Sequence, residues 1–260
     1  MNKKSRFIRD NISYYFSAKT KYDIHSPFVF EFVTKVLNQK KASNEQIENI
    51  EKIRRDLLHS SLLINVEDFG AGSSSQQTIL HKVKDIVKNS SKSSKYANLL
   101  YRLINYYKLT NILELGTSAG ISSMYMAVAS GNVVTIEGSP ETAKLAGENF
   151  NKLGFENIQQ RIGNIDELLP EIASQQTFDC VFFDANHTEE ATIRYFELCL
   201  KSIKNESVFI FDDINWSDGM KKAWHNIKQH ASVKVTIDLF FMGIVFFRKE
   251  LSKEDFVIRF

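Results

Sequence analysis

Short apolar runs alternate with amphipathic stretches over the second half of the chain. Runs typical of buried β-strands cover residues 111–115, 133–137, 158–163, 178–184 and 207–213. Helical patterns separate them, at residues 119–129, 140–152, 165–173 and 188–203. Because strands that alternate with helices form parallel sheets with helices on both faces, the pattern predicts a doubly wound, Rossmann-like α/β fold.

The last part of the chain shows a different pattern. Two β runs, residues 233–240 and 243–249, are separated only by Phe241 and Met242. Such a short connection favours an antiparallel hairpin. We therefore expect a seven-stranded sheet that ends in an antiparallel hairpin.

The first part of the chain is predicted to be mainly helical. Phe28, Phe32, Val33 and Val36 recur at helical spacing after a Ser-Pro start. A polar stretch rich in Ser and Lys, residues 89–96, interrupts the helical pattern before another amphipathic helix at 97–108. We therefore expect an N-terminal helical cap or lid at residues 1–95 and the main domain at 96–260.

Composition and charge exclude several classes of protein. The 260 residues suit one large domain, and 33 basic against 31 acidic residues give a formal net charge of +2. With no run of five like charges, binding to nucleic acid or a membrane through bulk charge is not expected, although a local basic patch is left open. No apolar run is long enough for a membrane helix or a signal peptide, and the two cysteines, Cys180 and Cys199, have no metal or disulfide spacing. A soluble cytoplasmic protein with buried thiols is the expectation.

Two glycine-rich turns each follow a strand-like run, in INVEDFGAGSSSQQ (64–77) and NILELGTSAGISSM (111–124). In a doubly wound fold the cofactor turn leaves the first strand, and an acidic residue ends the next strand about 20 residues later. The second turn meets this condition, because Glu137 closes a strand 23 residues after Glu114. The first fails, since no second strand follows Asp68 at the right distance. Residues 116–122 are therefore the predicted cofactor loop, and their lack of a G-x-G-x-x-G pattern disfavours a dinucleotide.

These motifs carry a family resemblance. LELGTSAGISS, TIEGSP, GNIDELL and FDCVFFDANH together resemble the class I S-adenosylmethionine-dependent methyltransferases over about residues 100–250. The resemblance implies that Gly116 to Gly120 hold the methionine part of the cofactor, that Ser122 reaches its carboxylate, and that Glu137 binds the ribose hydroxyls. It implies that Asn164 and Ile165 border the adenine, with a simple turn as the alternative for Asn164. Glu114 would support the loop or the cofactor amino group. The implied cofactor-binding residues are Glu114, Gly116, Thr117, Ser118, Gly120, Ser122, Glu137, Gly138, Asn164, Ile165 and Asp184.

Three carboxylates follow two of the predicted strands. Asp184 ends the strand at 178–184, while Asp212 and Asp213 end the strand at 207–213. Neighbouring parallel strands bring their carboxyl ends to one edge of a sheet, where clustered carboxylates repel each other unless a cation lies among them. The pattern predicts a divalent ion such as Mg²⁺, which would lower the pKa of a substrate hydroxyl for attack on a sulfonium methyl group. The alternative is that Asp184 caps a helix or contacts the cofactor and that Asp212 and Asp213 are turn residues.

The carboxylate pattern is similar to that of metal-dependent small-molecule O-methyltransferases of the catechol and macrolide-sugar types. The catechol type carries Asp-Asn where this chain has Asp212-Asp213, and the sugar type carries Asp-Asp, which matches more closely. His187 stands where catechol enzymes have a lysine base, so it is a candidate general base or a capping residue. Trp216 could wall an apolar substrate or pack in the core.

The most concrete hypothesis is an enzyme that methylates a hydroxyl of a small molecule with S-adenosylmethionine and a divalent metal. An N-methyltransferase or aminopropyltransferase of the same fold is the first alternative, although DANH lacks the Asn-Pro-Pro-Tyr-like motif. A non-catalytic cofactor-binding scaffold is the second. No nucleic-acid or membrane partner is expected, and a homodimer is left open. The turn at residues 70–75 is interpreted as part of a lid, with Asp68 fixing it.

Overall fold

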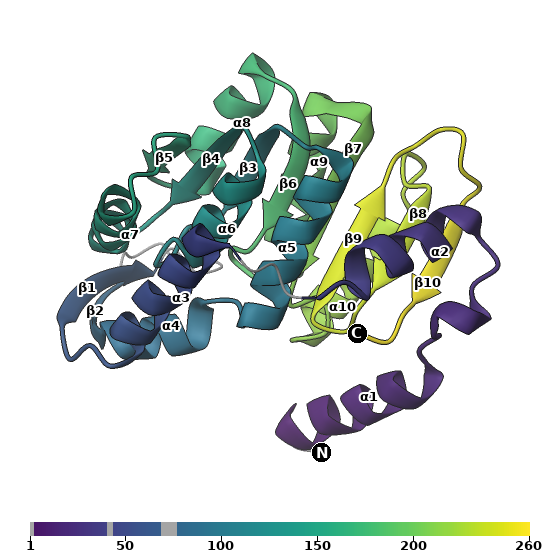
Figure 1. Ribbon diagram of the computed structural model, residues 1–260, viewed down its shortest axis with the longest axis horizontal. Helices are drawn as coiled ribbons and strands as arrows, with labels where there is room; N and C mark the ends of the chain where they lie inside the picture. Colours follow the sequence, from purple (N-terminus) through teal and green to yellow (C-terminus); the bar gives the residue numbers. More distant parts are fainter. Residues whose placement is uncertain (1–2, 41–43, 69–76) are drawn as a thin grey trace. The chain divides into compact units, whose positions relative to one another are not determined.

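The computed structural model describes residues 3–40, 44–68 and 77–260 (Figure 1). The chain divides into two compact units, one made of residues 1–38 and 177–260, the other of residues 39–176. The unit of residues 39–176 contains the predicted cofactor loop. The other unit contains the predicted metal ligands.

The unit of residues 39–176 contains helices and a hairpin before the first parallel strand. Its elements are α3 (Glu45–Leu58), β1 (Leu63–Asp68), β2 (Gln77–Lys82), α4 (Val83–Ser90), α5 (Ser94–Tyr107), β3 (Asn111–Leu115), α6 (Ile121–Ala129), β4 (Asn132–Glu137), α7 (Pro140–Lys152), β5 (Ile158–Ile162) and α8 (Ile165–Gln175). Strands β3, β4 and β5 are parallel neighbours in that order. The βαβ alternation expected from the apolar runs is therefore confirmed.

Apolar side chains decide how this unit packs. Four of the five residues of β3 are buried, as expected for a strand covered on both faces. Helix α6 is buried along most of its length and shares a core cluster with α3, α5 and α7, made of Ile47, Ile50, Ile53, Ala97, Ile121, Met124, Tyr125, Ala146 and Phe150. The short helix that carries the cofactor loop is therefore fixed on several sides.

The first glycine-rich segment has a different structure from the second. Strands β1 and β2 pair antiparallel, with Leu63 opposite Lys82 and Asp68 opposite Gln77. A second strand does follow the turn, but as a hairpin and not as a βαβ unit. The N-terminal region is thus helical with one hairpin, and the predicted lid turn at residues 70–75 lies outside the described residues.

The other unit begins with helices and ends with strands. Its elements are α1 (Lys3–Ser17), the 3₁₀ turn η1 (Lys21–Asp23), α2 (Pro27–Phe32), the π-helical η2 (Val33–Leu37), β6 (Phe178–Phe183), α9 (Glu189–Cys199), η3 (Leu200–Ser202), β7 (Ile203–Asp212), α10 (Asp218–Gln229), β8 (Val235–Asp238), β9 (Met242–Phe246) and β10 (Glu254–Val257). Strands β6 and β7 are parallel. Strand β9 runs antiparallel to both β7 and β8, so the predicted terminal hairpin is confirmed.

One strand of the main sheet was not predicted. Strand β10 pairs parallel with β8 at the edge, which gives eight strands where seven were expected. Only Phe256 of its four residues is buried. An edge strand of mostly polar residues carries almost no hydrophobic pattern, so sequence periodicity could not reveal it.

Aromatic residues fill the core of this unit. Phe183 and Phe211 stack, and the rings of Phe196 and Phe209 lie around them. Cys180 and Cys199 are free, buried thiols, and burial raises the pKa of both, which confirms the expectation of inert core cysteines. No helix in the described part of the chain is both long and apolar enough to cross a bilayer.

The predicted boundary near residue 95 falls within the unit of residues 39–176. Helix α4 precedes it and α5 follows it, both packed among the helices of that unit. A cap formed by residues 1–95 stays a prediction.

Candidate functional site

The loop after β3 requires unusual backbone conformations. Gly116 has φ of 97°, Ser118 of 49° and Gly120 of 80°. The N–H of Gly116 donates to the carbonyl oxygen of Ile136 on β4 at 3.0 Å, which fixes the start of the loop. Helix α6 begins directly after Gly120. The sequence thus turns from strand to helix within five residues, as the prediction for a cofactor loop requires.

Close packing explains why residue 120 is a glycine. A Cβ atom built there would lie 2.4 Å from Cε1 of Phe150 and 3.3 Å from the Cβ of Ala146. Both neighbours belong to α7. The absence of a side chain therefore lets α6 begin against α7, in addition to allowing the positive φ.

A chain of hydroxyl groups holds Glu114 at the end of β3. The register of β3 and β4 places Thr135 opposite Glu114. The Thr135 hydroxyl donates to Oε2 of Glu114 at 2.7 Å, and Ser123 on α6 donates to the same oxygen. The Thr117 and Thr135 hydroxyl oxygens lie 2.6 Å apart, so Thr117 must be the donor to Thr135. Loop, strand and helix are thereby joined through one carboxylate.

Two buried polar atoms at this loop lack a hydrogen-bond partner within the described residues. They are Oε1 of Glu114 and Oγ of Ser118. Glu114 is fully buried, and desolvation raises its pKa to about 7 despite hydrogen bonds from Ser122, Ser123 and Thr135. Buried polar groups normally have partners, so unpaired ones at a glycine-rich loop indicate where polar atoms of a ligand would bind.

Glu137 at the end of β4 is tied to the same loop. Its Oε2 accepts from the Ser118 N–H at 2.8 Å, and its Oε1 accepts from the Ser139 N–H at 3.0 Å. Burial raises its pKa, although backbone N–H groups, including that of Gly138, oppose this. The predicted β4 carboxylate therefore does stand beside the predicted loop.

Three other predicted cofactor residues lie nearby in the fold of this unit. Ser122 is buried, and its hydroxyl is among the groups that hydrogen-bond Glu114. Asn164 is the N-cap of α8 and accepts from the Asp166 N–H at 2.9 Å, with Ile165 as the first helical residue. The structure thus gives Asn164 the turn role, and its contact with adenine stays a prediction.

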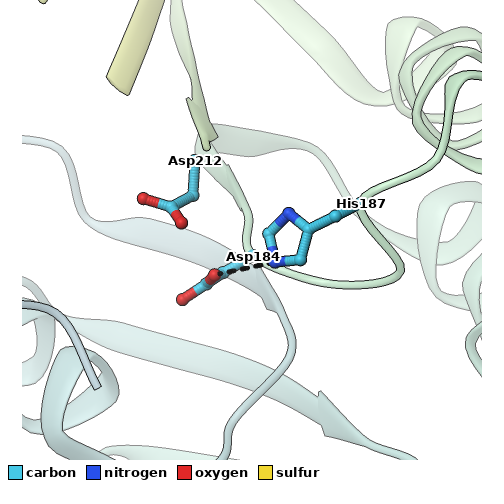
Figure 2. Close-up of side chains that lie close together, drawn as sticks. All are labelled: Asp184, His187 and Asp212. Atoms are coloured by element: carbon cyan, nitrogen blue, oxygen red, sulfur yellow. Dashed lines mark ion pairs between the residues drawn. The ribbon is translucent and has the colours of Figure 1, made fainter. Parts of the chain in front are cut away.

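The second group of predicted residues forms at the ends of β6 and β7. Phe183 pairs with Phe211, so the following residues, Asp184 and Asp212, leave the two strands side by side. Potential ligand atoms of Asp184, His187 and Asp212 all lie within 4.8 Å of one another (Figure 2). Nε2 of His187 is 3.6 Å from Oδ1 of Asp184. The predicted convergence of Asp184 and Asp212 is what the structure shows.

Burial strengthens the repulsion between the two carboxylates of this group, which we call the acidic group. Asp212 is 3% exposed, and the side chain of Asp184 is 10% exposed. Two largely buried carboxylates this close repel each other, and a cation bound among them would offset that repulsion. Thr188, and not Asp184, caps α9, since its side chain accepts from the Ala191 N–H. The capping alternative for Asp184 is therefore not supported.

The turns that carry these residues have strained backbones. Asn186, His187 and Asp213 have φ of 63°, 20° and 52°, which residues with side chains seldom adopt. Strain of this kind is concentrated at functional sites. Asn186 was not singled out from the sequence, yet its Oδ1 is buried without a hydrogen-bond partner in the described structure, while its Nδ2 donates to Tyr195. Its only sequence signal was its place in DANH.

Asp213 lies outside the group formed by Asp184, His187 and Asp212. Its N–H donates to the carbonyl oxygen of Phe241 at 2.7 Å, and its carbonyl accepts from the Trp216 N–H at 2.9 Å. Its role as a metal ligand stays a prediction. Trp216 is 64% exposed and meets the ring of Phe7 edge to face, so it is not a core residue.

Comparisons with known proteins find relatives of the segment that carries these two groups. Residues 113–214 match the family model described as a methyltransferase domain. The catechol O-methyltransferase of Niastella koreensis is 30% identical over 131 residues, which cover 48% of this chain and 57% of the relative. The chain spans a little over half the length of the curated catechol O-methyltransferases it matches.

Solved structures share the fold. An O-methyltransferase from Bacillus cereus in complex with SAH superimposes with a TM-score of 0.56 at 21% identity, over 84% of this chain and 97% of that one. The O-methyltransferase TomG from Streptomyces achromogenes, in complex with SAM, gives a TM-score of 0.57 at 19% identity, over 83% and 93%. These likenesses confirm the Rossmann-like α/β fold.

Residues 113–214 therefore match a methyltransferase domain, and the curated relatives agree with the resemblance to class I S-adenosylmethionine-dependent methyltransferases. The curated relatives compared above are named catechol O-methyltransferases. The two solved structures that share the fold are O-methyltransferases. Both predicted groups of site residues lie within or beside the matched segment, from Glu114 to Asp213.

Proposed function

We propose that the protein transfers the methyl group of S-adenosylmethionine to a hydroxyl oxygen of a small molecule, with the help of a divalent cation. The group of Asp184, His187 and Asp212 is the observation that supports a hydroxyl acceptor and a bound cation. The methyltransferase match and the two unpaired polar atoms at the β3 loop support the methyl donor.

In this proposal the β3 loop binds the cofactor. Oε1 of Glu114 and Oγ of Ser118 have unused capacity for hydrogen bonds with polar groups of the amino acid part. Glu137 would accept from the ribose hydroxyls through whichever lone pairs its backbone donors leave open. Gly116 and Gly120 keep side chains away from the ligand. Asn164 and Ile165 would border the adenine.

The acidic group would hold the cation through carboxylate oxygens of Asp184 and Asp212, the kind of ligand that Mg²⁺ and Mn²⁺ prefer. When bound, such an ion lowers the pKa of an acceptor hydroxyl. His187 would take the hydroxyl proton on Nε2, because an imidazole titrates near neutral pH. The acceptor oxygen would then take the methyl group as the bond from carbon to sulfur breaks, which would leave the neutral thioether product and a protonated His187.

The names of the curated relatives support a catechol as the first acceptor to assay. A catechol has two adjacent hydroxyls, and the named relatives are catechol O-methyltransferases. The Asp212-Asp213 pair differs from the Asp-Asn pattern of the catechol type, so a vicinal diol of a sugar is the second acceptor to assay.

The test measures donor, metal and transfer separately. Calorimetry should show binding of S-adenosylmethionine and of its demethylated product, and the absence of binding by both would overturn the proposal. Methyl transfer from labelled cofactor to a catechol or a diol should need Mg²⁺ or Mn²⁺ and should stop with a chelator. Full activity in chelator would exclude the metal role while leaving the methyltransferase assignment intact.

Variants assign the roles within the acidic group. Asp212→Asn should abolish metal-dependent turnover while cofactor binding persists. His187→Ala should lower turnover, because the proposed proton acceptor is lost, while binding of S-adenosylmethionine and of Mg²⁺ or Mn²⁺ persists. Asp213→Asn is the comparison. A loss of metal-dependent turnover equal to that of Asp212→Asn would make Asp213 a metal ligand. Near-normal turnover would restrict the metal ligands to the group of Asp184, His187 and Asp212.

A further inference from the structure

Positive charge is concentrated in the first part of the chain. Residues 1–22 contain six basic residues and one acidic residue, Asp10, which leaves 27 basic and 30 acidic residues for the other positions. The whole-chain charge of +2 therefore conceals a basic segment. Most of this segment forms helix α1, Lys3–Ser17.

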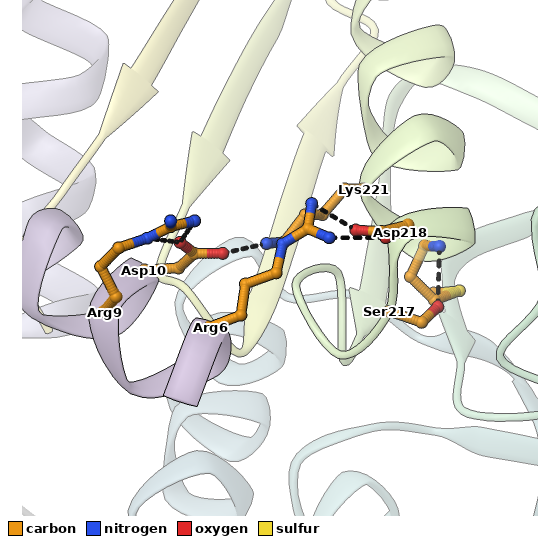
Figure 3. A network of polar contacts seen from close by, with 7 residues as sticks. Arg6, Arg9, Asp10, Ser217, Asp218 and Lys221 are labelled. Carbon is orange, nitrogen blue, oxygen red and sulfur yellow. Dashed lines mark hydrogen bonds and ion pairs between the residues drawn. The ribbon is translucent and has the colours of Figure 1, made fainter. Parts of the chain in front are cut away.

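One side of α1 attaches the helix to its own unit. The ring of Phe7 lies 5.3 Å from that of Phe240, and the Tyr14 hydroxyl accepts from the Phe260 N–H. Polar contacts to α10 add to this, because Arg6 pairs with Asp218 at 2.7 Å and Asp10 pairs with Lys221 (Figure 3). The helix is thus fixed by Phe7, Tyr14 and their ionic neighbours.

A different side of α1 presents large apolar residues to solvent. Ile8, Ile12, Tyr15 and Phe16 are 50%, 52%, 54% and 80% exposed. They are spaced by four, three and one residues, which places them in one row along a helix. None of them takes part in the Phe7 and Tyr14 contacts that attach the helix. We call these four residues the outer row.

Cationic groups accompany the outer row. The guanidinium of Arg259 lies 4.4 Å above the Tyr15 ring, and Arg9, next to Ile8, is 61% exposed. Beyond the helix, Lys21 Nζ lies 4.9 Å from the ring of Tyr22, which is 82% exposed. The acidic side chain within α1, Asp10, is bonded by both Lys221 and Arg9. The surface is therefore apolar along its centre with mainly basic side chains around it, and the exposed carboxylate of Asp23 lies near Lys19 and Arg259.

We propose that the outer row of α1 is a docking surface for an anionic lipid membrane. An amphipathic helix with Ile, Tyr and Phe on one side and Lys or Arg beside them can lie in the headgroup region, with its apolar residues inserted and its cations on lipid phosphates. A second copy of the chain fits less well, because it would bring two positive surfaces together. Nucleic acid would use the cations but leave the aliphatic side chains unsatisfied.

This proposal is compatible with the other findings. A helix that lies on a membrane needs no segment that crosses it, and the described residues contain no such segment. The near-neutral net charge argued against bulk electrostatic binding, yet it left a local basic patch open. The proposal does not depend on the proposed methyltransferase activity.

Vesicle co-sedimentation of the full chain tests the proposal. Binding should be strong to phosphatidylcholine vesicles that contain phosphatidylglycerol, weak to phosphatidylcholine alone, and weaker at high salt. The pair Ile12→Ser and Phe16→Ser should reduce partitioning by about tenfold or more, since two large apolar groups no longer insert. Arg9→Gln and Lys21→Gln should each reduce binding by about fivefold.

Matched variants separate the outer row from general surface effects. Leu62→Ser and Leu80→Ser remove apolar residues of similar exposure, 56% and 57%, in the other unit, and should bind as the unmodified chain does. Far-ultraviolet circular dichroism should be the same for all variants, because the substituted side chains are exposed. Equal loss of binding in both pairs would overturn the proposal.

Three further results would also overturn it. The first is no binding to phosphatidylglycerol vesicles at low salt. The second is a concentration-dependent dimer in light scattering that the Ile12→Ser and Phe16→Ser pair abolishes, which would make the outer row an interface between copies. The third is binding of an RNA homopolymer that competes fully with vesicles and survives loss of the outer row, which would assign the basic segment to nucleic acid.

Discussion

The rings of Phe183 and Phe211 stack with centroids 4.3 Å apart and planes 11° apart, one residue before Asp184 and Asp212. The two phenylalanines also face each other in the register of β6 and β7. The stack therefore packs at the two strand ends, directly before Asp184 and Asp212 in the sequence.

Replacing Phe211 with Leu should weaken metal binding as well as stability. Loss of the stacked pair and part of the buried volume should lower the free energy of unfolding by about 1–3 kcal/mol. Because Asp212 then loses its fixed position, affinity for Mn²⁺ should fall about tenfold or more, as calorimetry would show. Phe178→Leu is the control, because Phe178 is as buried as Phe211 but lies at the other end of β6 from Asp184. An equal loss of metal affinity in both variants would contradict the role of the stack.

Gly120→Ala should damage the cofactor loop more than a glycine substitution elsewhere. The new methyl group would meet Phe150 at 2.4 Å in a backbone with φ of 80°, so unfolding free energy should fall by about 2–4 kcal/mol. Gly154→Ala is a matched control, because Gly154 has φ of 69° but open space around its Cα, so about 1 kcal/mol is expected. Chemical denaturation measures both. Similar losses in the two variants would mean that Phe150 moves aside readily.

Glu114 should make stability depend on pH. Burial raises its pKa from 4.5 to about 7, so the folded protein retains a proton that the unfolded chain has released between these values. The contribution of Glu114 to stability is therefore greatest below about pH 4.5 and is lost as the pH rises through about 7. Glu114→Gln should be more stable than the unmodified protein at about pH 8, by on the order of 3 kcal/mol, with little difference near pH 4.5. Urea unfolding across this range is the measurement, with Glu137→Gln as the comparison because burial raises that pKa also.

Cofactor binding can distinguish the two roles expected for Glu114. If the amino group of S-adenosylmethionine bonds to the unpaired Oε1, its positive charge lowers the pKa of Glu114, and binding at about pH 6.5 releases a proton. Calorimetry in buffers of different ionisation enthalpy counts that proton. No release in the unmodified protein, or the same release in Glu114→Gln, would leave Glu114 as a support of the loop only.

Asn164→Ala should separate a turn role from a cofactor role. Loss of the side chain that caps α8 should cost about 1 kcal/mol of unfolding free energy. Asn44→Ala removes an equivalent cap, which accepts from the Ile47 N–H at 2.8 Å, and should cost about the same. If Asn164 also borders adenine, only its variant should bind S-adenosylmethionine more weakly. Unchanged cofactor affinity in both variants would restrict Asn164 to the turn.

Local patterns in the sequence were sufficient for the cofactor side of the protein. The strand at 111–115 and the helix at 140–152 were predicted with the bounds that the structure has. Glycines at positions 116 and 120 and acids at 114 and 137 identify a strand, a tight turn and the next strand, because all of these constraints operate within one βαβ unit. The order of Asp184 and Asp212 after neighbouring strands was likewise readable from the apolar runs.

Contacts between distant residues were decided only by the tertiary structure. The hydroxyl chain from Thr117 through Thr135 to Glu114 depends on the register of β3 and β4, which no local pattern contains. The edge strand β10 has almost no apolar periodicity, and it forms because β8 offers unpaired backbone groups. The two sides of α1 look alike in sequence, since both carry aromatic residues. Only packing against Phe240 and α10 decided that Phe7 and Tyr14 face inward while Ile12 and Phe16 face solvent.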